Sequence, residues 1–151
     1  MDFTLTADTD VDAPVDSVYR VITDIDRLPE WNKEIGQVHE SPEAMGPGAQ
    51  WVVEIHAMGT HWRSRSEVVE VDAAGGVFAY RSVSDDGNPS FADWRWELTP
   101  TDEGRTHVVV AVSANPRTFW RRYLLSNLRP PVLRAAMDRS LRALGNQVAV
   151  R

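Results

Sequence analysis

The stretch that decides the fold is Arg27-Leu28-Pro29-Glu30-Trp31-Asn32. It follows a short helical segment that opens at Pro14, and it precedes an unbroken series of strand-like segments. One long helical segment closes the chain. The order of strand, helix, short turn with a buried Trp, six strands and final helix predicts a sheet curled around its last helix. Because such a sheet encloses an apolar pocket, the first functional question is what fills that pocket.

The strand predictions rest on alternation of side chains and on turn chemistry between the segments. Phe3, Leu5 and Ala7 alternate with polar residues in the first segment. Clusters of Gly, Pro, Asn and Asp separate the later ones, and their regular spacing favours antiparallel neighbours. The expected strands are residues 2–11, 35–40, 49–57, 61–71, 77–84, 91–99 and 105–114.

The helical segments carry apolar residues at helical spacing. Val15, Val18 and Ile22 form one stripe, and the spacing of Leu28 and Trp31 predicts a second short helical turn. Residues 116–148 have the same periodicity, but Pro130-Pro131 interrupts them. Because proline costs roughly 3 kcal/mol inside a helix, this segment is either a kinked helix or a short helix followed by a long one from near Pro131.

Composition narrows the class of protein. The chain has 151 residues, a length typical of a single domain, which we expect to span residues 1–151. It lacks cysteine, which excludes disulfides and thiolate chemistry. We find no secretory leader pattern and no apolar run that approaches 18 residues, and therefore expect a cytoplasmic protein.

The net charge of −6 is unevenly distributed. Residues 1–115 contain 8 Lys/Arg and 21 Asp/Glu, whereas residues 116–151 contain 8 Arg and one acid. One interpretation is a basic helix that docks on an acidic sheet within one fold. The other is a basic surface for an anionic lipid or partner, which would allow contact with a membrane surface. An acidic sheet would repel nucleic acid, so we expect no nucleic-acid partner.

Charged residues indicate which face of each strand meets water, because side chains alternate between the two faces. With the charged positions outside, the inner face becomes aromatic and aliphatic with a few hydroxyls. Such a surface suits a flat or elongated organic ligand, although the indoles could equally fill a core. The ligand-binding residues predicted in this way, with two from the turn and two from the last segment, are Trp31, Asn32, Trp51, Val53, Ile55, Trp62, Ser64, Ser66, Phe78, Tyr80, Trp94, Trp96, Tyr123 and Met137.

Candidates for catalysis are sparse. The alternation places His56, His61 and His107 on the outward face, and no metal-binding motif is present, so we expect neither a metal nor a cofactor. The catalytic residues are unknown, with Tyr80 and Asp93 as weak candidates. Apolar neighbours could raise the pKa of Asp93, but an exposed acid beside Arg95 is the alternative.

Several motifs together resemble a known family. Ala13-Pro14-Val15-Asp16-Ser17-Val18-Tyr19 is similar to the first-helix signature of the START-like, Bet v 1-like (SRPBCC) helix-grip superfamily. Leu28-Pro29-Glu30-Trp31-Asn32 resembles the tryptophan turn of its polyketide cyclase/dehydrase branch. The segments Gly48-Ala49-Gln50-Trp51, Val68-Val69-Glu70-Val71-Asp72 and Trp96-Glu97-Leu98-Thr99-Pro100 match that branch in order. The resemblance covers nearly the whole chain.

The resemblance implies an α+β helix-grip fold. In this fold a curved antiparallel sheet of about seven strands wraps around a long C-terminal helix, and two short helices follow the first strand. It also implies a hydrophobic small-molecule ligand, such as a lipid, a polyketide or a related aromatic, in the cavity between sheet and helix. The alternative is a polyketide cyclase or dehydratase acting in the same cavity. We expect a monomer or homodimer, and whether the chain is an enzyme stays open at this stage.

Overall fold

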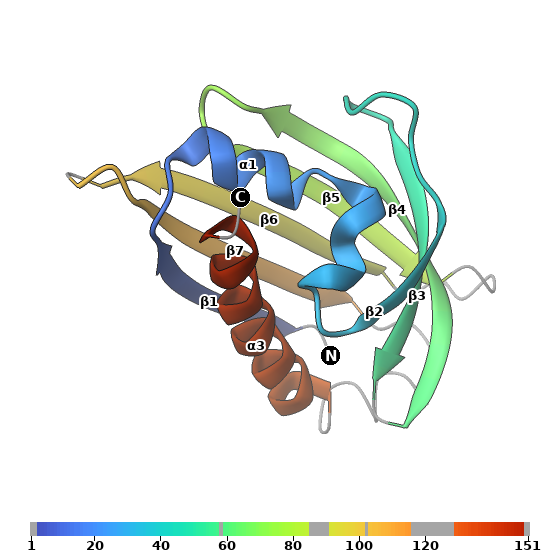
Figure 1. Ribbon diagram of the computed structural model, residues 1–151. Coiled ribbons are helices and arrows are strands. Elements are labelled where there is room, and N and C mark those ends of the chain that lie inside the picture. Colours follow the sequence, from blue (N-terminus) through green and yellow to red (C-terminus); the bar gives the residue numbers. More distant parts are fainter. Residues whose placement is uncertain (1–2, 58, 85–90, 102, 116–128, 150–151) are drawn as a thin grey trace.

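The computed structural model describes residues 3–57, 59–84, 91–101, 103–115 and 129–149. Seven antiparallel strands form one curved sheet, and the helices α1, η1 and α3 lie over a single face of it (Figure 1). This arrangement confirms the predicted helix-grip fold. In chain order the elements are β1 (Phe3–Val11), α1 (Val15–Ile22), the 3-10 helix η1 (Ile25–Glu30), β2 (Ile35–Glu40), β3 (Gln50–Ala57), β4 (Thr60–Asp72), β5 (Val77–Ser84), β6 (Phe91–Pro100), β7 (Thr106–Asn115) and α3 (Arg129–Ala149).

The strands lie in the order β1-β7-β6-β5-β4-β3-β2, so β1 pairs with the last strand and β2 forms the opposite edge. The register shifts twice in β2 and once in β4, between Val68 and Glu70. The extra residue in β4 is Val69, which is 64% exposed while Val68 before it is buried. A bulge of this kind bends and twists a strand, which helps the sheet to curve.

The two short helices begin the cover over the concave face. α1 starts at Val15, one residue later than expected, and Pro14 is its N-cap. It buries Val18, Val21 and Ile22 against the sheet. The Tyr19 hydroxyl donates a 2.8 Å hydrogen bond to the Val77 carbonyl and so ties α1 to the start of β5. η1 then turns the chain toward β2, and Trp31 directly after it is only 1% exposed.

The C-terminal helix completes the cover. α3 begins at Arg129, so Pro130 and Pro131 occupy its first turn, where a missing backbone N–H removes no helical hydrogen bond. A long helix thus begins close to Pro131, as the second alternative has it, while the segment before it that would distinguish a kinked helix from two helices lies outside the described residues. Tyr123, which the sequence predicts as a ligand-binding residue before this helix, lies outside the described residues. α3 packs into the core with its apolar face, whose buried residues are Leu133, Ala136, Met137, Leu141, Leu144 and Val148.

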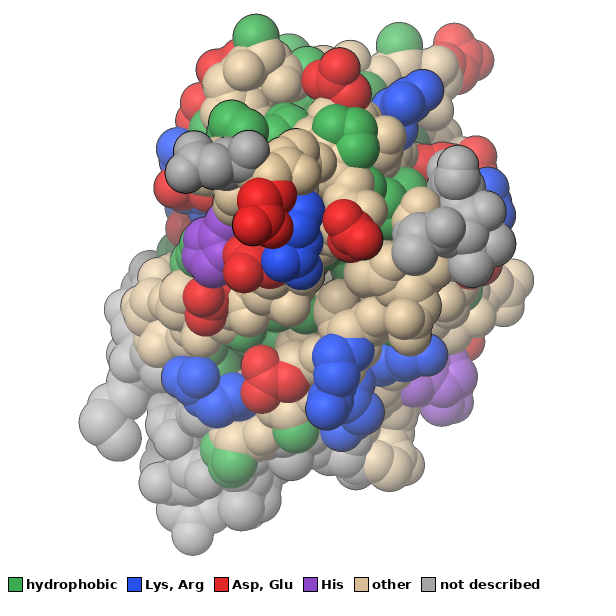
Figure 2. Space-filling view, turned by 60° about the vertical axis from the view of Figure 1, so that its left-hand side comes forward, with side chains coloured by type: hydrophobic (Ala, Val, Ile, Leu, Met, Phe, Trp, Pro, Cys, Tyr) green, Lys and Arg blue, Asp and Glu red, His purple; other side chains and the backbone are tan. Residues whose placement is uncertain are grey.

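Charged side chains of both signs lie on the face of the molecule seen in Figure 2. Acidic and basic side chains are interspersed over the face in Figure 2, and hydrophobic side chains form small separate patches. Among the described residues, Val69 is the one large hydrophobic side chain that is exposed. None of the helices in this part of the chain combines the length and the apolar character needed to cross a bilayer.

Candidate functional site

The concave face of the sheet carries the aromatic and hydroxyl residues that the alternation predicted there. Trp51, Val53, Phe78 and Trp96 are at most 4% exposed. Ile55, Trp62, Tyr80 and Trp94 are only partly buried, so this face is not uniformly covered. The charged residues predicted to face outward do so as well: Arg63, Glu67 and Arg81 alternate with the inner-face residues of their strands and are exposed.

The aromatic rings form a continuous layer across β3, β5 and β6. Trp51 stacks on Phe78 with ring centroids 6.0 Å apart, and it meets Tyr80 edge-on at 5.0 Å. Tyr80 in turn stacks on Trp94 at 6.2 Å with an interplanar angle of 16°. Offset stacks and edge contacts of this kind each add about 0.5–1.5 kcal/mol beyond the area that they bury. Ring contacts therefore hold the layer together, and Tyr80 and Trp94 are the pair in it that lie nearly parallel.

A small space lies between this layer, the turn after η1 and α3. It has a volume of about 20 Å³, which is room for one water-sized group. Trp94 and Trp96 of β6 form one wall, and Met137 of α3 faces them. Among the described residues the lining includes three polar side chains and consists of Asn32, Glu34, Trp94, Trp96, Val110, Leu133, Ala136, Met137 and Ser140.

Hydrogen bonds hold the polar side of this space in place. The Lys33 backbone N–H donates to the Ser140 hydroxyl at 2.9 Å, which docks the turn on α3. Asn32 accepts a hydrogen bond from the Glu34 N–H through its Oδ1 at 3.2 Å, so it shapes the turn as well as lining the space. The Glu34 carbonyl accepts from the His56 N–H at 2.7 Å, which joins the turn to β3.

Three polar groups on aromatic side chains belong to or adjoin the aromatic layer: the indole N–H groups of Trp96 and Trp31 and the hydroxyl of Tyr80. The Trp96 indole N–H donates to the Tyr80 hydroxyl at 3.4 Å. Burial raises the pKa of Tyr80 to about 12, and the hydrogen bond from Trp96 opposes this rise. Tyr80 is therefore neutral at pH 7 and can donate a hydrogen bond. The indole N–H of Trp31, whose ring meets Trp96 edge-on at 5.6 Å, is buried without a hydrogen-bond partner.

The inner hydroxyls are partly engaged with one another. The hydroxyls of Ser66 and Ser82 form a 2.6 Å hydrogen bond across β4 and β5. Ser64 is 7% exposed and lies beside Val53 in the register of β3 and β4. These serines relieve the apolar character of the face without introducing charge.

Some predicted residues are not brought to this space. Asp93 lies on the outer face, where its carboxylate accepts hydrogen bonds of 2.7 and 3.0 Å from Arg81 across the β5–β6 pair. It is therefore separated from the inner layer, and its partner is Arg81 rather than Arg95. Tyr123 lies outside the described residues. Of the predicted binding residues, Asn32, Trp94, Trp96 and Met137 line the space directly.

The sequence reasoning missed Glu34 and Ser140. Glu34 is 9% exposed and Ser140 is 6% exposed. Glu34 was absent from the prediction because charge was used as a sign of exposure. Its place immediately after the buried Trp31 turn is the signal that could have pointed to it.

Three histidines gather around Glu54 on the outer face, where His56 and His61 were predicted to lie. His39, His56 and His61 come from three adjacent strands and surround Glu54, with nitrogen–oxygen distances of 4.0, 3.0 and 3.6 Å. These contacts, led by the hydrogen bond from His56, lower the pKa of the Glu54 carboxyl. Within the described chain, no three or more His, Asp or Glu side chains are arranged to hold a metal ion.

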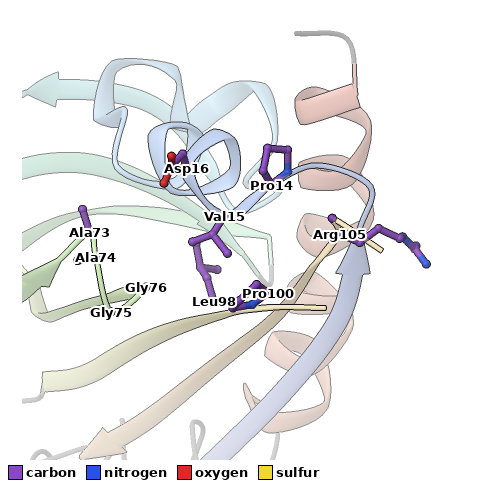
Figure 3. Close-up of a pocket in the computed structure, with 11 residues that line it drawn as sticks. Pro14, Val15, Asp16, Ala73, Ala74, Gly75, Gly76, Leu98, Pro100 and Arg105 are labelled. Carbon is purple, nitrogen blue, oxygen red and sulfur yellow. The ribbon is translucent and has the colours of Figure 1, made fainter. Parts of the chain in front are cut away.

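A second hollow of about 360 Å³ opens at the other end of the sheet, where α1 begins. Val15 and Leu98 form its floor, and the turn from Ala73 to Gly76 forms one wall (Figure 3). In this view the Arg105 side chain points away from the hollow. The hollow shares no residue with the space beside Glu34.

Comparison with known proteins agrees with this geometry. The family described as polyketide cyclase / dehydrase and lipid transport matches residues 2–149. The chain belongs to this family. No functionally curated protein matches the sequence.

Solved structures show the same fold at low sequence identity. The Zhui aromatase/cyclase from Streptomyces sp. R1128 aligns with a TM-score of 0.78 and 20% identity, over 100% of this chain and 97% of the other. TTHA0849 from Thermus thermophilus gives 0.76 and 22%, over 98% of each chain. A START superfamily protein from Mycobacterium smegmatis gives 0.69 and 14%, over 97% of each.

Proposed function

We propose that this protein binds a hydrophobic small molecule on the concave face, between the sheet and α3. The observation that carries the proposal is the flat, partly buried pair of Tyr80 and Trp94 beside a polar space lined by Asn32, Glu34 and Ser140. Small-molecule sites combine a mainly apolar wall with a few polar groups that fix orientation. Membership of a family that includes lipid transport supports the same function.

The residues have distinct roles in this proposal. Tyr80 and Trp94 provide a planar apolar surface for the body of the ligand. Trp51, Phe78 and Trp96 back that surface from the core and keep the rings in place. Ile55 and Trp62, which are adjacent in the register of β3 and β4, extend the apolar surface toward the end of that hairpin. Lipids, polyketides and related aromatics all fit this chemistry.

The alternative is a cyclase or dehydratase that uses the same surface. It is favoured by the neutral Tyr80 hydroxyl, which could stabilise an enolate oxygen by donating a hydrogen bond. Ser64 and Asn32 would orient the substrate, and proximity would supply much of the rate. Asp93 has no part in either proposal because it faces outward in an ion pair. Tyr80→Phe should reduce turnover of a cyclising substrate more than tenfold, and unchanged turnover would remove this assignment.

Titration with aromatic and lipid ligands tests the binding function directly. Quenching of Trp fluorescence should show saturable binding to the wild-type protein. Trp94→Ala should weaken binding about tenfold because it removes one ring of the stacked pair. Val69→Ala is the matched control, since Val69 is exposed in the bulge of β4. The proposal fails if no ligand of the panel binds, or if both variants bind like the wild type.

The wider predictions remain proposals. They are a single domain over residues 1–151, a cytoplasmic location, and a monomer or homodimer. Contact with a membrane surface would use the Arg-rich C-terminal segment, of which Arg134, Arg139 and Arg142 are exposed on α3. Arg121 and Arg122 lie outside the described residues. Charge reversal at the three exposed arginines should weaken binding to anionic liposomes if such contact occurs.

A further inference from the structure

Of the nine described residues that line the space between β6 and α3, Glu34 is the one that is ionisable. It is 9% exposed, and its neighbours in the lining are indoles, aliphatic side chains, an amide and a hydroxyl. A carboxylate in such surroundings is costly unless it serves as an acceptor for hydrogen bonds. Its presence on this wall therefore points to the chemistry of what meets it.

The polar groups on this wall, Glu34 included, take part in interactions within the protein. The Asn32 side-chain oxygen accepts from the Glu34 N–H, and the Ser140 hydroxyl accepts from the Lys33 N–H. The carboxylate of Glu34 has about four acceptor positions, so it can receive a hydrogen bond from a ligand in addition to its bonds within the protein. The wall thus offers a ligand mainly acceptors and negative charge.

The size of the space sets the size of the group. A volume of about 20 Å³ admits one water-sized group, such as a hydroxyl. Trp94 links this space to the rest of the aromatic face, because it lines the space and also stacks on Tyr80. A ring lying on Tyr80 and Trp94 can direct a hydroxyl substituent toward Glu34.

We propose that Glu34 determines ligand specificity: it selects hydrophobic ligands with an aromatic body and a hydroxyl donor, and it rejects ligands with a carboxylate at that end. This inference rests on the proposed function and narrows its ligand class. Hydrogen bonds to charged groups are worth about 1.5–3 kcal/mol, which corresponds to roughly tenfold to a hundredfold in affinity. An anionic ligand loses that bond and is repelled by the carboxylate as well.

Three naphthalene probes of matched shape test the inference at pH 7 by equilibrium dialysis. 2-Naphthol supplies a donor, 2-methylnaphthalene supplies none, and 2-naphthoate supplies a negative charge. Wild-type protein should bind 2-naphthol at least tenfold more tightly than either of the others. Glu34→Gln should reduce the preference for 2-naphthol over 2-methylnaphthalene at least threefold and strengthen 2-naphthoate binding about tenfold. Glu43→Gln, at an exposed position between β2 and β3, is the matched control and should preserve the wild-type order.

The outcomes separate the inference from the function on which it rests. If the wild-type protein binds all three probes equally, or if Glu34→Gln retains the wild-type order, Glu34 does not select the ligand although the face binds aromatics. If none of the probes binds to the wild type, the proposed function fails together with the inference. Should Glu34→Gln not fold, as judged by circular dichroism, the three wild-type affinities decide the matter alone.

Discussion

Removing the hydroxyl of Tyr80 should change how the stability of the protein depends on pH. Tyr80 lies in the middle of the aromatic layer, and its burial raises the pKa of the hydroxyl from 10.0 to about 12. The folded state therefore favours the neutral phenol. Tyr80→Phe keeps the ring and its stacking on Trp94 but abolishes this titration.

The magnitude follows from the linkage between protonation and folding. A group whose pKa is raised in the folded state contributes its full stability below the pKa of the unfolded chain, here about 10, and loses it as the pH rises toward 12. Each pKa unit corresponds to about 1.4 kcal/mol, so the limiting loss is about 2.7 kcal/mol. By pH 11.5, we expect about 1–2 kcal/mol of this loss, since the ring is partly exposed.

Urea unfolding of the wild type and of Tyr80→Phe, from pH 8 to 11.5, measures this difference. The free energy of unfolding of the wild type should fall relative to the variant only above pH 10. Comparing the two proteins cancels the contributions of groups that they share, including Tyr19, whose pKa burial also raises. If the difference stays constant over this range, Tyr80 titrates normally and is not desolvated in the aromatic layer.

Three further outcomes are expected. Gly76→Ala should lower the free energy of unfolding by at least 2 kcal/mol more than Gly104→Ala does. Both glycines have positive φ, but a Cβ at Gly76 would lie 2.3 Å from the Leu98 carbonyl oxygen, whereas a Cβ at Gly104 would meet no atom within 4 Å. Equal denaturant midpoints of the two variants would refute the clash. Ser140→Ala should lower the free energy of unfolding by about 1–3 kcal/mol by leaving the N–H of the docked turn without its acceptor, and an unchanged melting curve would show that the turn does not depend on α3. Glu54→Gln should be less stable than the wild type at pH 7, because the pKa of this carboxyl is lowered in the folded state. The gap should close as the pH falls below the ordinary value of 4.5 and through the lowered pKa, and a gap that persists at low pH would contradict this.

Much of the fold could be predicted because local signals agreed with each other. Turn residues marked the ends of the strands, and charged positions showed which face of each strand met water. The positions of Trp51 and Trp96 on the inner face followed from nothing more than alternation with Glu54 and Arg95. The bulge at Val69 changes which face the later residues of β4 point to, but Trp62, Ser64 and Ser66 come before it, so their predicted facing is unaffected.

Contacts between distant strands were beyond this reasoning. Val52 points outward and yet is 0% exposed, because Arg65 of β4 and Glu40 of β2 form a 3.1 Å ion pair across β3 at its level. The ion pair of Arg95 and Glu70 crosses β5 in the same way at Ala79. Whether an ion pair covers an outward-facing residue in this way depends on the register of the strands and on long side chains that reach across the strand between them.

The same limit explains why the polar end of the site was missed. Glu34 was not among the predicted residues, since charged residues are almost never fully buried without partners. Its burial depends on α3, more than 100 residues later in the chain, to which the Lys33–Ser140 hydrogen bond ties the turn. A local pattern holds no information on that contact.

The central claim is that a hydrophobic ligand occupies the concave face between the sheet and α3. Native mass spectrometry of the protein as purified from its own host, before and after organic extraction, tests it most directly. The account predicts an added mass that extraction removes and that proves to be a hydrophobic compound. An unliganded mass before extraction, together with no Trp quenching by aromatic or lipid ligands, would contradict it and make the indole layer purely a structural core.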